Sequence, residues 1–121
     1  MKTIKVSKAT GPALDWLVAK CEGCSEKRLT NTAMWLHTRQ QGAFRFSTYW
    51  SEGGPIIDRE DIFFSPLPDM GLRAFQFKDG QYLNIVDCWP YKEQPTRLVL
   101  GMRCYVTSKL GDTAEVPEEL V

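Results

Sequence analysis

Two cysteines separated by two residues, Cys21 and Cys24, are the first feature of this sequence with the spacing of a chemical site. That spacing lets both sulfurs face one ion, as in half of a zinc site, and it also occurs in redox pairs. A structural zinc needs two further ligands, and the remaining candidates stand singly: His37, Cys88 and Cys104. We find no cation placed to lower a thiol pKa, which redox catalysis requires. We therefore predict no metal site and reduced, inert thiols.

Acid, base and nucleophile chemistry has few candidates in the chain. His37 is the only histidine, so it would have to be the base of any nucleophilic scheme, yet no nucleophile elbow stands near it. The acidic run Asp58, Glu60 and Asp61 surrounds Arg59 and reads as the charged edge of a strand, which discourages aggregation. We predict no catalytic residue, no cofactor and no enzyme activity.

The run Gly53-Gly54-Pro55 follows Trp50 by three residues. It lacks the Lys-Ser/Thr of a Walker loop and the glycine spacing of a dinucleotide fold. Adjacent glycines permit positive φ and close backbone approach, which serve a tight turn or a ligand. The frequency of Gly and Pro in turns favours a turn here. Trp50, directly before it, stands where an indole can line a pocket.

Aromatic residues concentrate in the first half of the chain around one arginine, Arg45. Such residues can stack nucleobases, as in single-strand binders, although core packing consumes aromatics at a similar rate. The residues concerned are Trp35, Phe44, Phe46, Tyr49 and Trp50. Core packing is the interpretation that we favour.

The bulk composition is that of an ordinary globular protein. The chain has 121 residues, of which 43% are hydrophobic and 25% charged, and this length fits one domain spanning residues 1–121. Fifteen basic residues balance fifteen acidic ones, so no global positive field attracts a phosphate backbone. The N-terminus lacks the apolar run of a signal peptide, and no later run is long enough to span a bilayer. We expect the protein in the host cytoplasm.

Hydrophobic periodicity and turn residues indicate the elements that must position any site. Alternation predicts a strand around residues 4–6, and apolar spacing after Pro12 predicts a helix over about 12–21, followed by a loop from 24 to 32. Further strands are expected at 33–38, 43–50 and from residue 56. A hairpin is expected around Lys78-Asp79-Gly80-Gln81, because Asp-Gly between alternating apolar runs favours one. A second helix is predicted from Pro95-Thr96 to Gly111, with Val116 and Leu120 as apolar contacts of the tail.

These elements predict an α+β domain. We expect a mostly antiparallel sheet of four or five strands, with an N-terminal and a C-terminal helix packed on it.

Three blocks of the sequence resemble one family: "GPALDWLVAK", "STYWSEGGPIIDRE" and "MRCYVTSKLGD" followed by "VPEEL". They resemble the NinX-like family of small proteins encoded by tailed phages and prophages. The resemblance implies an intracellular phage accessory protein and brings no established reaction. The family commonly has an aspartate directly before the tryptophan, where this chain has Tyr49. Residues 24–45 fit the family poorly and read as an elaboration of this protein.

Several positions that match the family need more than packing to explain them. Two arrangements stay open: an Asp15–Arg103 ion pair between the helices, or a cleft in which Arg103 and Trp50 face a small anionic or aromatic ligand. The predicted ligand-binding or partner-binding residues are Asp15, Trp16, Trp50, Gly53, Gly54, Arg59 and Arg103.

Three functional hypotheses follow. The leading one is a phage accessory protein that acts without catalysis, by binding a host or phage protein. The second is a small-molecule binder that sequesters a nucleotide signal of host defence, which predicts a pocket around Trp50, Gly53 and Gly54. The third is single-stranded nucleic-acid binding, which predicts aromatics on an exposed sheet face and salt-sensitive association.

Overall fold

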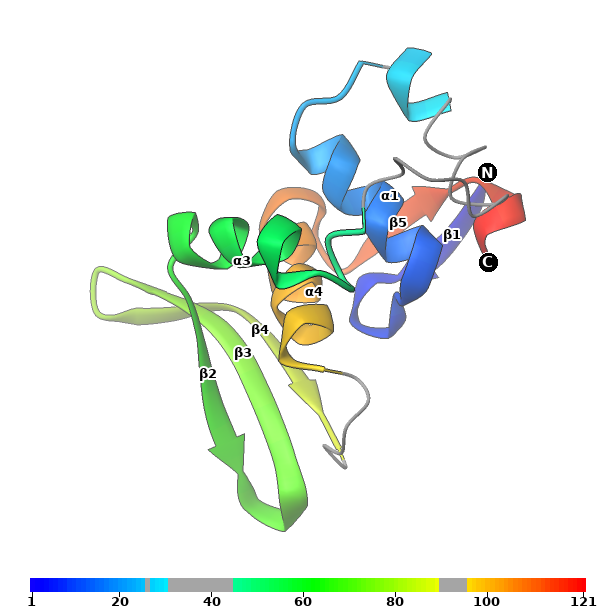
Figure 1. Cartoon of the computed structure of the whole chain (residues 1–121). Helices are drawn as coiled ribbons and strands as arrows, with labels where there is room; N and C mark the ends of the chain where they lie inside the picture. Colours follow the sequence, from blue (N-terminus) through cyan, green and yellow to red (C-terminus); the bar gives the residue numbers. More distant parts are fainter. Residues whose placement is uncertain (26, 31–44, 90–95) are drawn as a thin grey trace.

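The computed structural model describes residues 1–25, 27–30, 45–89 and 96–121. It confirms the α+β class: five antiparallel strands and three longer helices make up most of the described chain (Figure 1). The strands lie in two sheets. In chain order the elements are β1 (Lys2–Lys5), η1 (Val6–Lys8), α1 (Gly11–Cys21), α3 (Trp50–Arg59), β2 (Ile62–Leu67), η2 (Pro68–Met70), β3 (Gly71–Lys78), β4 (Gln81–Cys88), α4 (Arg97–Leu110), β5 (Thr113–Val116) and η3 (Glu118–Leu120).

The larger sheet has the order β2-β3-β4, with β3 in the centre. The predicted hairpin is confirmed: β3 and β4 pair from Lys78↔Gln81 onward, and Asp79 and Gly80 form the turn with φ of 52° and 76°. Two successive positive φ values suit the right-handed twist of a hairpin, which is why Asp-Gly is favoured there. Pro66 lies inside β2, where an edge strand tolerates its missing N–H.

The smaller sheet joins the two ends of the chain. β1 pairs with β5 in antiparallel register, from Lys2↔Val116 to Lys5↔Thr113. Figure 1 shows both termini beside this ribbon. Val116 and Leu120 are buried, as expected of the tail's apolar contacts.

Helix α4 lies at the centre of the molecule and contacts α1, α3, β5 and all three strands of the larger sheet (Figure 1). Its ends match the sequence signals: the Thr96 side chain accepts a hydrogen bond from the Val99 N–H, and Gly111 follows the helix with φ of 86°. Nearly every residue from Leu98 to Val106 is buried. The core therefore forms around α4.

The largest correction concerns residues 50–60. The predicted turn at Gly53-Gly54-Pro55 and the first part of the strand predicted from residue 56 are wrong, because this stretch forms helix α3. The end of that predicted strand is confirmed, since β2 begins at Ile62. Gly53 is buried in the helix, and a side chain there would meet the Phe46 carbonyl and lie 2.6 Å from Leu98 Cδ1. The glycine thus permits close packing against α4, and this tertiary contact overrides the local preference for a turn.

Smaller differences concern the neighbouring segments. Residues 27–30 form a helical turn inside the predicted loop. Residues 45–49 form a turn leading into α3, so the second half of the predicted 43–50 strand is wrong. The predicted strand at 33–38, with Trp35 and His37, and Phe44 lie outside the described residues.

Candidate functional site

The predicted binding residues lie on three helices and do not form one cluster. Asp15 and Trp16 belong to α1, Trp50 to Arg59 span α3, and Arg103 lies in the middle of α4. Trp50 and Arg59 begin and end α3, which separates their backbones by about 14 Å at 1.5 Å per residue. We therefore describe their surroundings one at a time.

Asp15 is a buried carboxylate that holds the segment before α3. Its Oδ1 accepts a hydrogen bond of 2.8 Å from the Ser47 N–H, although only 1% of Asp15 is exposed. Burial raises the pKa of Asp15 to about 6, and the hydrogen bonds from Ser47 offset part of that rise. The expected partner, Arg103, is engaged elsewhere, so the predicted Asp15–Arg103 pair is wrong.

Arg103 is itself almost buried and binds the chain before α1. Its Nε donates a hydrogen bond of 2.7 Å to the Ala9 carbonyl. Burial lowers its pKa from the usual value. Arg103 thus ties α4 to the segment between η1 and α1, a contact 94 residues apart in the sequence.

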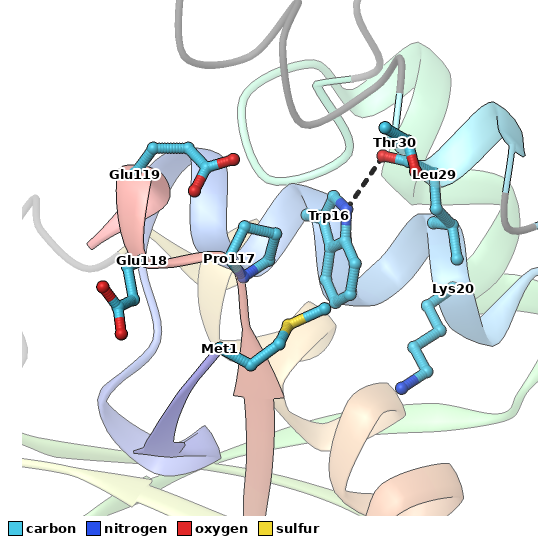
Figure 2. Close-up of a pocket in the computed structure, with 8 residues that line it drawn as sticks. All are labelled: Met1, Trp16, Lys20, Leu29, Thr30, Pro117, Glu118 and Glu119. Atoms are coloured by element: carbon cyan, nitrogen blue, oxygen red, sulfur yellow. Dashed lines mark hydrogen bonds between the residues drawn. The ribbon is translucent and has the colours of Figure 1, made fainter.

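Trp16 is buried beside a cavity of about 690 Å³ (Figure 2). Its indole Nε1 donates to the Leu29 carbonyl at 3.1 Å, and the Lys20 ammonium lies 5.7 Å from the ring centroid. Pro117 and Met1 continue the apolar wall. Two carboxylates, Glu118 and Glu119, also line the cavity, whose full lining is Met1, Trp16, Lys20, Leu29, Thr30, Pro117, Glu118 and Glu119. Trp50, Gly53 and Gly54 do not belong to it.

Trp50 opens α3 and is 55% exposed. A methyl group on Gly54 would lie 3.4 Å from Trp50 Cε3, an ordinary van der Waals contact. Gly53 is buried and faces Phe46 and Leu98. The two glycines therefore have different neighbours, and neither borders the cavity beside Trp16.

Arg59 forms a network that joins the ends of α1 and α3 to α4. Its guanidinium donates to both carboxylate oxygens of Glu22, at 3.1 and 2.7 Å, and Nε binds Glu60 at 3.0 Å. The Tyr105 hydroxyl donates to the same Glu22 at 2.5 Å. The Arg59 hydrogen bonds are the main cause that lowers the pKa of Glu22. This network fastens three helices together.

The cysteines that the structure describes are free thiols. Burial raises the pKa of Cys21 to about 11 and that of Cys104 to about 12, so both thiols are protonated at neutral pH. Cys104 Sγ also donates to the Asn84 carbonyl at 3.2 Å. Within the described residues, no three His, Cys, Asp or Glu side chains gather as metal ligands would.

The larger sheet has one covered and one uncovered face. Along β3, Leu72, Ala74 and Gln76 are buried against the helices, so the alternate residues Arg73, Phe75 and Phe77 point outward. We call this second side the open face. Extended across the strands by the pairing register and by alternation, it comprises Phe63, Ser65, Leu67, Gly71, Arg73, Phe75, Phe77, Tyr82, Ile85, Asp87 and, at its end, Trp89.

Aromatic rings in contact with one another dominate the open face. Phe75 lies 5.9 Å from Phe63 and 5.1 Å from Tyr82, and Phe77 lies 5.1 Å from Tyr82, measured between ring centroids. Five large side chains remain between 44% and 63% exposed: Phe63, Phe77, Tyr82, Ile85 and Trp89. Exposed apolar groups of this number in one patch are typical of interaction sites.

The charges on the open face cancel. Among the residues that the structure describes, the only cation of this face is Arg73, which forms a bidentate pair with Asp87 on the neighbouring strand, with distances of 2.7 and 2.9 Å. A ligand that docks here meets apolar rings and one neutralised pair.

The end of the sheet next to Trp89 has unusual backbone geometry. Asp69 and Met70 both have positive φ, 59° and 63°, in the connection between β2 and β3. The Trp89 indole packs over Gly71, whose missing side chain leaves room for the ring, and donates to the Pro68 carbonyl at 2.9 Å. Met70 is 72% exposed at this tip. The residues that are strained here border the open face.

Our sequence interpretation missed the open face. The alternation of Phe75 and Phe77 indicates that both lie on one side of the strand, but it does not say which side faces the core. A signal was nevertheless present. Phe63, Phe75, Phe77 and Tyr82 lie on strands that follow one another in the sequence, and these strands pair as neighbours in the sheet. Cross-strand register would have placed them together.

A comparison with protein families matches residues 5–109 to the family described as "Bacteriophage P22, NinX". The chain belongs to this phage NinX family. Most of the described fold, from the end of β1 to the last turn of α4, falls within the matched range of this NinX-family protein. A comparison with curated proteins finds no match.

The helices of this NinX-family chain were also compared with the length of a membrane span. In the parts of the chain that the structure describes, none is both long and apolar enough to cross a bilayer.

Proposed function

We propose that this NinX-family protein acts by binding another protein, from the host or the phage, through its open face. The observation that carries the proposal is an aromatic cluster in which Phe63, Phe77 and Tyr82 are exposed around the half-buried Phe75, although the opposite side of the same sheet is buried. Exposed aromatics cost solubility, and protein interfaces are enriched in them.

Charge favours a protein over a nucleic acid as the occupant. Aromatic faces can stack bases, but single-strand binders also supply cations along the phosphate backbone. The cation of the open face, Arg73, is already neutralised by Asp87. A protein surface of low charge fits such a face better than a polyanion does.

Small-molecule binding is a second candidate, which rests on the cavity beside Trp16. Its volume of about 690 Å³ lies within the usual range of ligand sites. Lys20, Glu118 and Glu119 put charges of both signs on its wall, so the lining offers no cluster of cations for the phosphates of a nucleotide. Thermal melting with a panel of nucleotides tests this alternative, since a bound ligand raises the melting midpoint. We expect no shift.

The experiment for the leading proposal begins by identifying the partner in infected cells. Phe77 is replaced by a photoreactive phenylalanine, and the crosslinked protein is identified by mass spectrometry. The matched control carries the same group in place of Asp58, an exposed residue on α3 outside the open face. A protein crosslinked from position 77 and not from position 58 is then purified.

Calorimetry with that purified protein decides the proposal. Wild type is compared with a double variant, Phe77→Thr with Tyr82→Thr, which keeps residues that favour strands but removes both rings. Trp50→Gln is the control, because Trp50 is exposed on a different surface. We expect the double variant to bind at least about tenfold more weakly, as loss of interface aromatics does, and the control to bind like wild type. Loss in the control alone, or binding of single-stranded DNA at the open face in place of a protein, would overturn the proposal.

A further inference from the structure

The ion pair on the open face has a property that the aromatic cluster lacks: it is self-complementary. Arg73 on β3 and Asp87 on β4 lie side by side, joined at 2.7 and 2.9 Å. A two-fold axis in the plane of the interface, parallel to the strands and between β3 and β4, would place Arg73 of one copy opposite Asp87 of the other. The same operation places Phe77 of one copy opposite Tyr82 of the other, because these two residues are paired across β3 and β4.

This arrangement is the standard geometry of two sheets that pack face to face. Such sheets lie about 10 Å apart with their strands nearly aligned, and the side chains of the inner faces interdigitate. A two-fold contact uses the same patch on both copies, so one self-complementary face is sufficient. With 15 basic and 15 acidic residues, two copies of the chain do not repel each other through net charge.

The size of the face indicates how strong such an association is. A fully buried large side chain covers about 150–250 Å², and five such side chains on the open face are roughly half exposed. They offer on the order of 500 Å² per copy, or about 1,000 Å² for a pair, the lower end for a specific interface. We therefore expect an association with a Kd of roughly 1–100 µM and not an obligate dimer.

We propose that a second copy of this chain covers the open face when no partner is bound. This inference rests on the proposed function, since both use the same face. It adds a regulatory consequence: a partner must compete with self-association, so the apparent affinity for the partner falls as the concentration of this protein rises. Dilution and partner binding both release the face.

Sedimentation of the full chain from about 1 to about 500 µM tests the inference over the expected range of Kd. We expect a reversible monomer–dimer equilibrium in wild type. The double variant Phe77→Thr with Tyr82→Thr should remain monomeric, and Trp50→Gln should dimerise like wild type. A monomer at every wild-type concentration, or a dimer that persists in the double variant, would refute the second copy as the occupant.

A charge exchange gives a test that does not depend on removing rings. Arg73→Glu leaves two acids on each face, and Asp87→Arg leaves two arginines, so each variant alone should be monomeric. When the two variants are mixed, opposite charges meet again, and we expect a heterodimer. Both side chains are partly exposed, at 36% and 25%, which makes these substitutions compatible with folding. Absence of a heterodimer in the mixture contradicts the proposed axis.

The two proposals fail in distinguishable ways. Partner binding is measured by calorimetry at low concentration of this chain, where it is monomeric in either case. A strictly monomeric protein that loses its partner in the double variant retains the proposed function and loses this inference. A protein that dimerises but crosslinks to no partner from position 77 retains this inference and loses the proposed function.

Discussion

The two faces of the larger sheet are built from the same three strands and have opposite surroundings. On the inner face, Leu72, Ala74 and Val86 are buried beneath α4, and the buried Gln76 binds the Glu60 carbonyl and Asn84. On the open face, larger aromatic rings are about half exposed to solvent. Burial stabilises a fold roughly in proportion to the apolar area removed from water. The free chain therefore leaves about half of the area of these rings available to a partner, as the proposed function requires.

This comparison divides the molecule into a buried part, around α4, and a half-exposed part that contributes less to folding. Substitutions in the first should change the free energy of unfolding, and those in the second should change binding. The following predictions test that division.

Two tryptophans give the largest expected contrast. Trp16→Ala should lower the free energy of unfolding by about 3–5 kcal/mol, because it removes a buried ring and its hydrogen bond to Leu29. Trp50→Ala should lower it by less than about 1 kcal/mol, since its side chain is mostly exposed. Urea denaturation of both variants measures the difference, and equal losses would contradict the division.

Asp15 should make the fold less stable as pH rises. Its pKa of about 6 in the folded chain exceeds the ordinary value of 3.8, so the folded state holds the proton more tightly. The stability that this proton provides is fully present below about pH 4 and is lost as pH rises through 6, by up to about 3 kcal/mol for two pKa units. Asp15→Asn should remove this dependence, and Asp58→Asn is the exposed control. Urea denaturation at several pH values between 4 and 8 measures this dependence. If the free energy of unfolding of Asp15→Asn falls with pH as steeply as that of wild type, Asp15 is not the cause.

Replacing each of the two glycines of α3 by alanine should change the free energy of unfolding in opposite directions. Gly53→Ala should destabilise by about 1–3 kcal/mol, because the methyl group meets the Phe46 carbonyl and Leu98. Gly54→Ala has room beside the exposed Trp50 and should be neutral or stabilising by up to about 1 kcal/mol, the usual gain of alanine within a helix. Thermal melting of the two variants separates the outcomes, and a destabilised Gly54→Ala would argue against helix α3.

Replacing Glu22 should have the smallest effect on the free energy of unfolding. Its dependence on pH should be opposite to that of Asp15. Arg59 holds the pKa of Glu22 below its usual 4.5, so its contribution is present at neutral pH and lost as pH falls below about 4.5. Because Arg59 is half exposed, we expect only about 1 kcal/mol. Glu22→Gln should lose this amount at pH 7 and nothing at pH 3. A loss of the same size at both pH values would show that packing, and not charge, explains it.

Elements with strong local signals were predictable from the sequence. Asp79-Gly80 located the hairpin, and Thr96 with Gly111 located the ends of α4. Strand β5 was missed because it is short and pairs with β1 at the other end of the chain. Helix α3 was missed because Gly53 serves a contact with Phe46 and α4 that no local pattern reveals.

The predicted binding residues have a structural role in the fold. The residues of the family motif that are charged or large, such as Asp15, Trp16 and Arg103, are buried in hydrogen bonds that hold the helices together. Their presence in the motif is explained by folding. Their role in binding stays a prediction, and the open face consists of residues outside that set.

The most direct test of the central claim is the affinity of the protein crosslinked from position 77 for the Phe77→Thr, Tyr82→Thr double variant. Calorimetry should show binding at least about tenfold weaker than to wild type, in a variant whose unfolding free energy falls by about 1–3 kcal/mol through the loss of two ring pairs. Binding equal to wild type would contradict the claim that the open face is the binding surface.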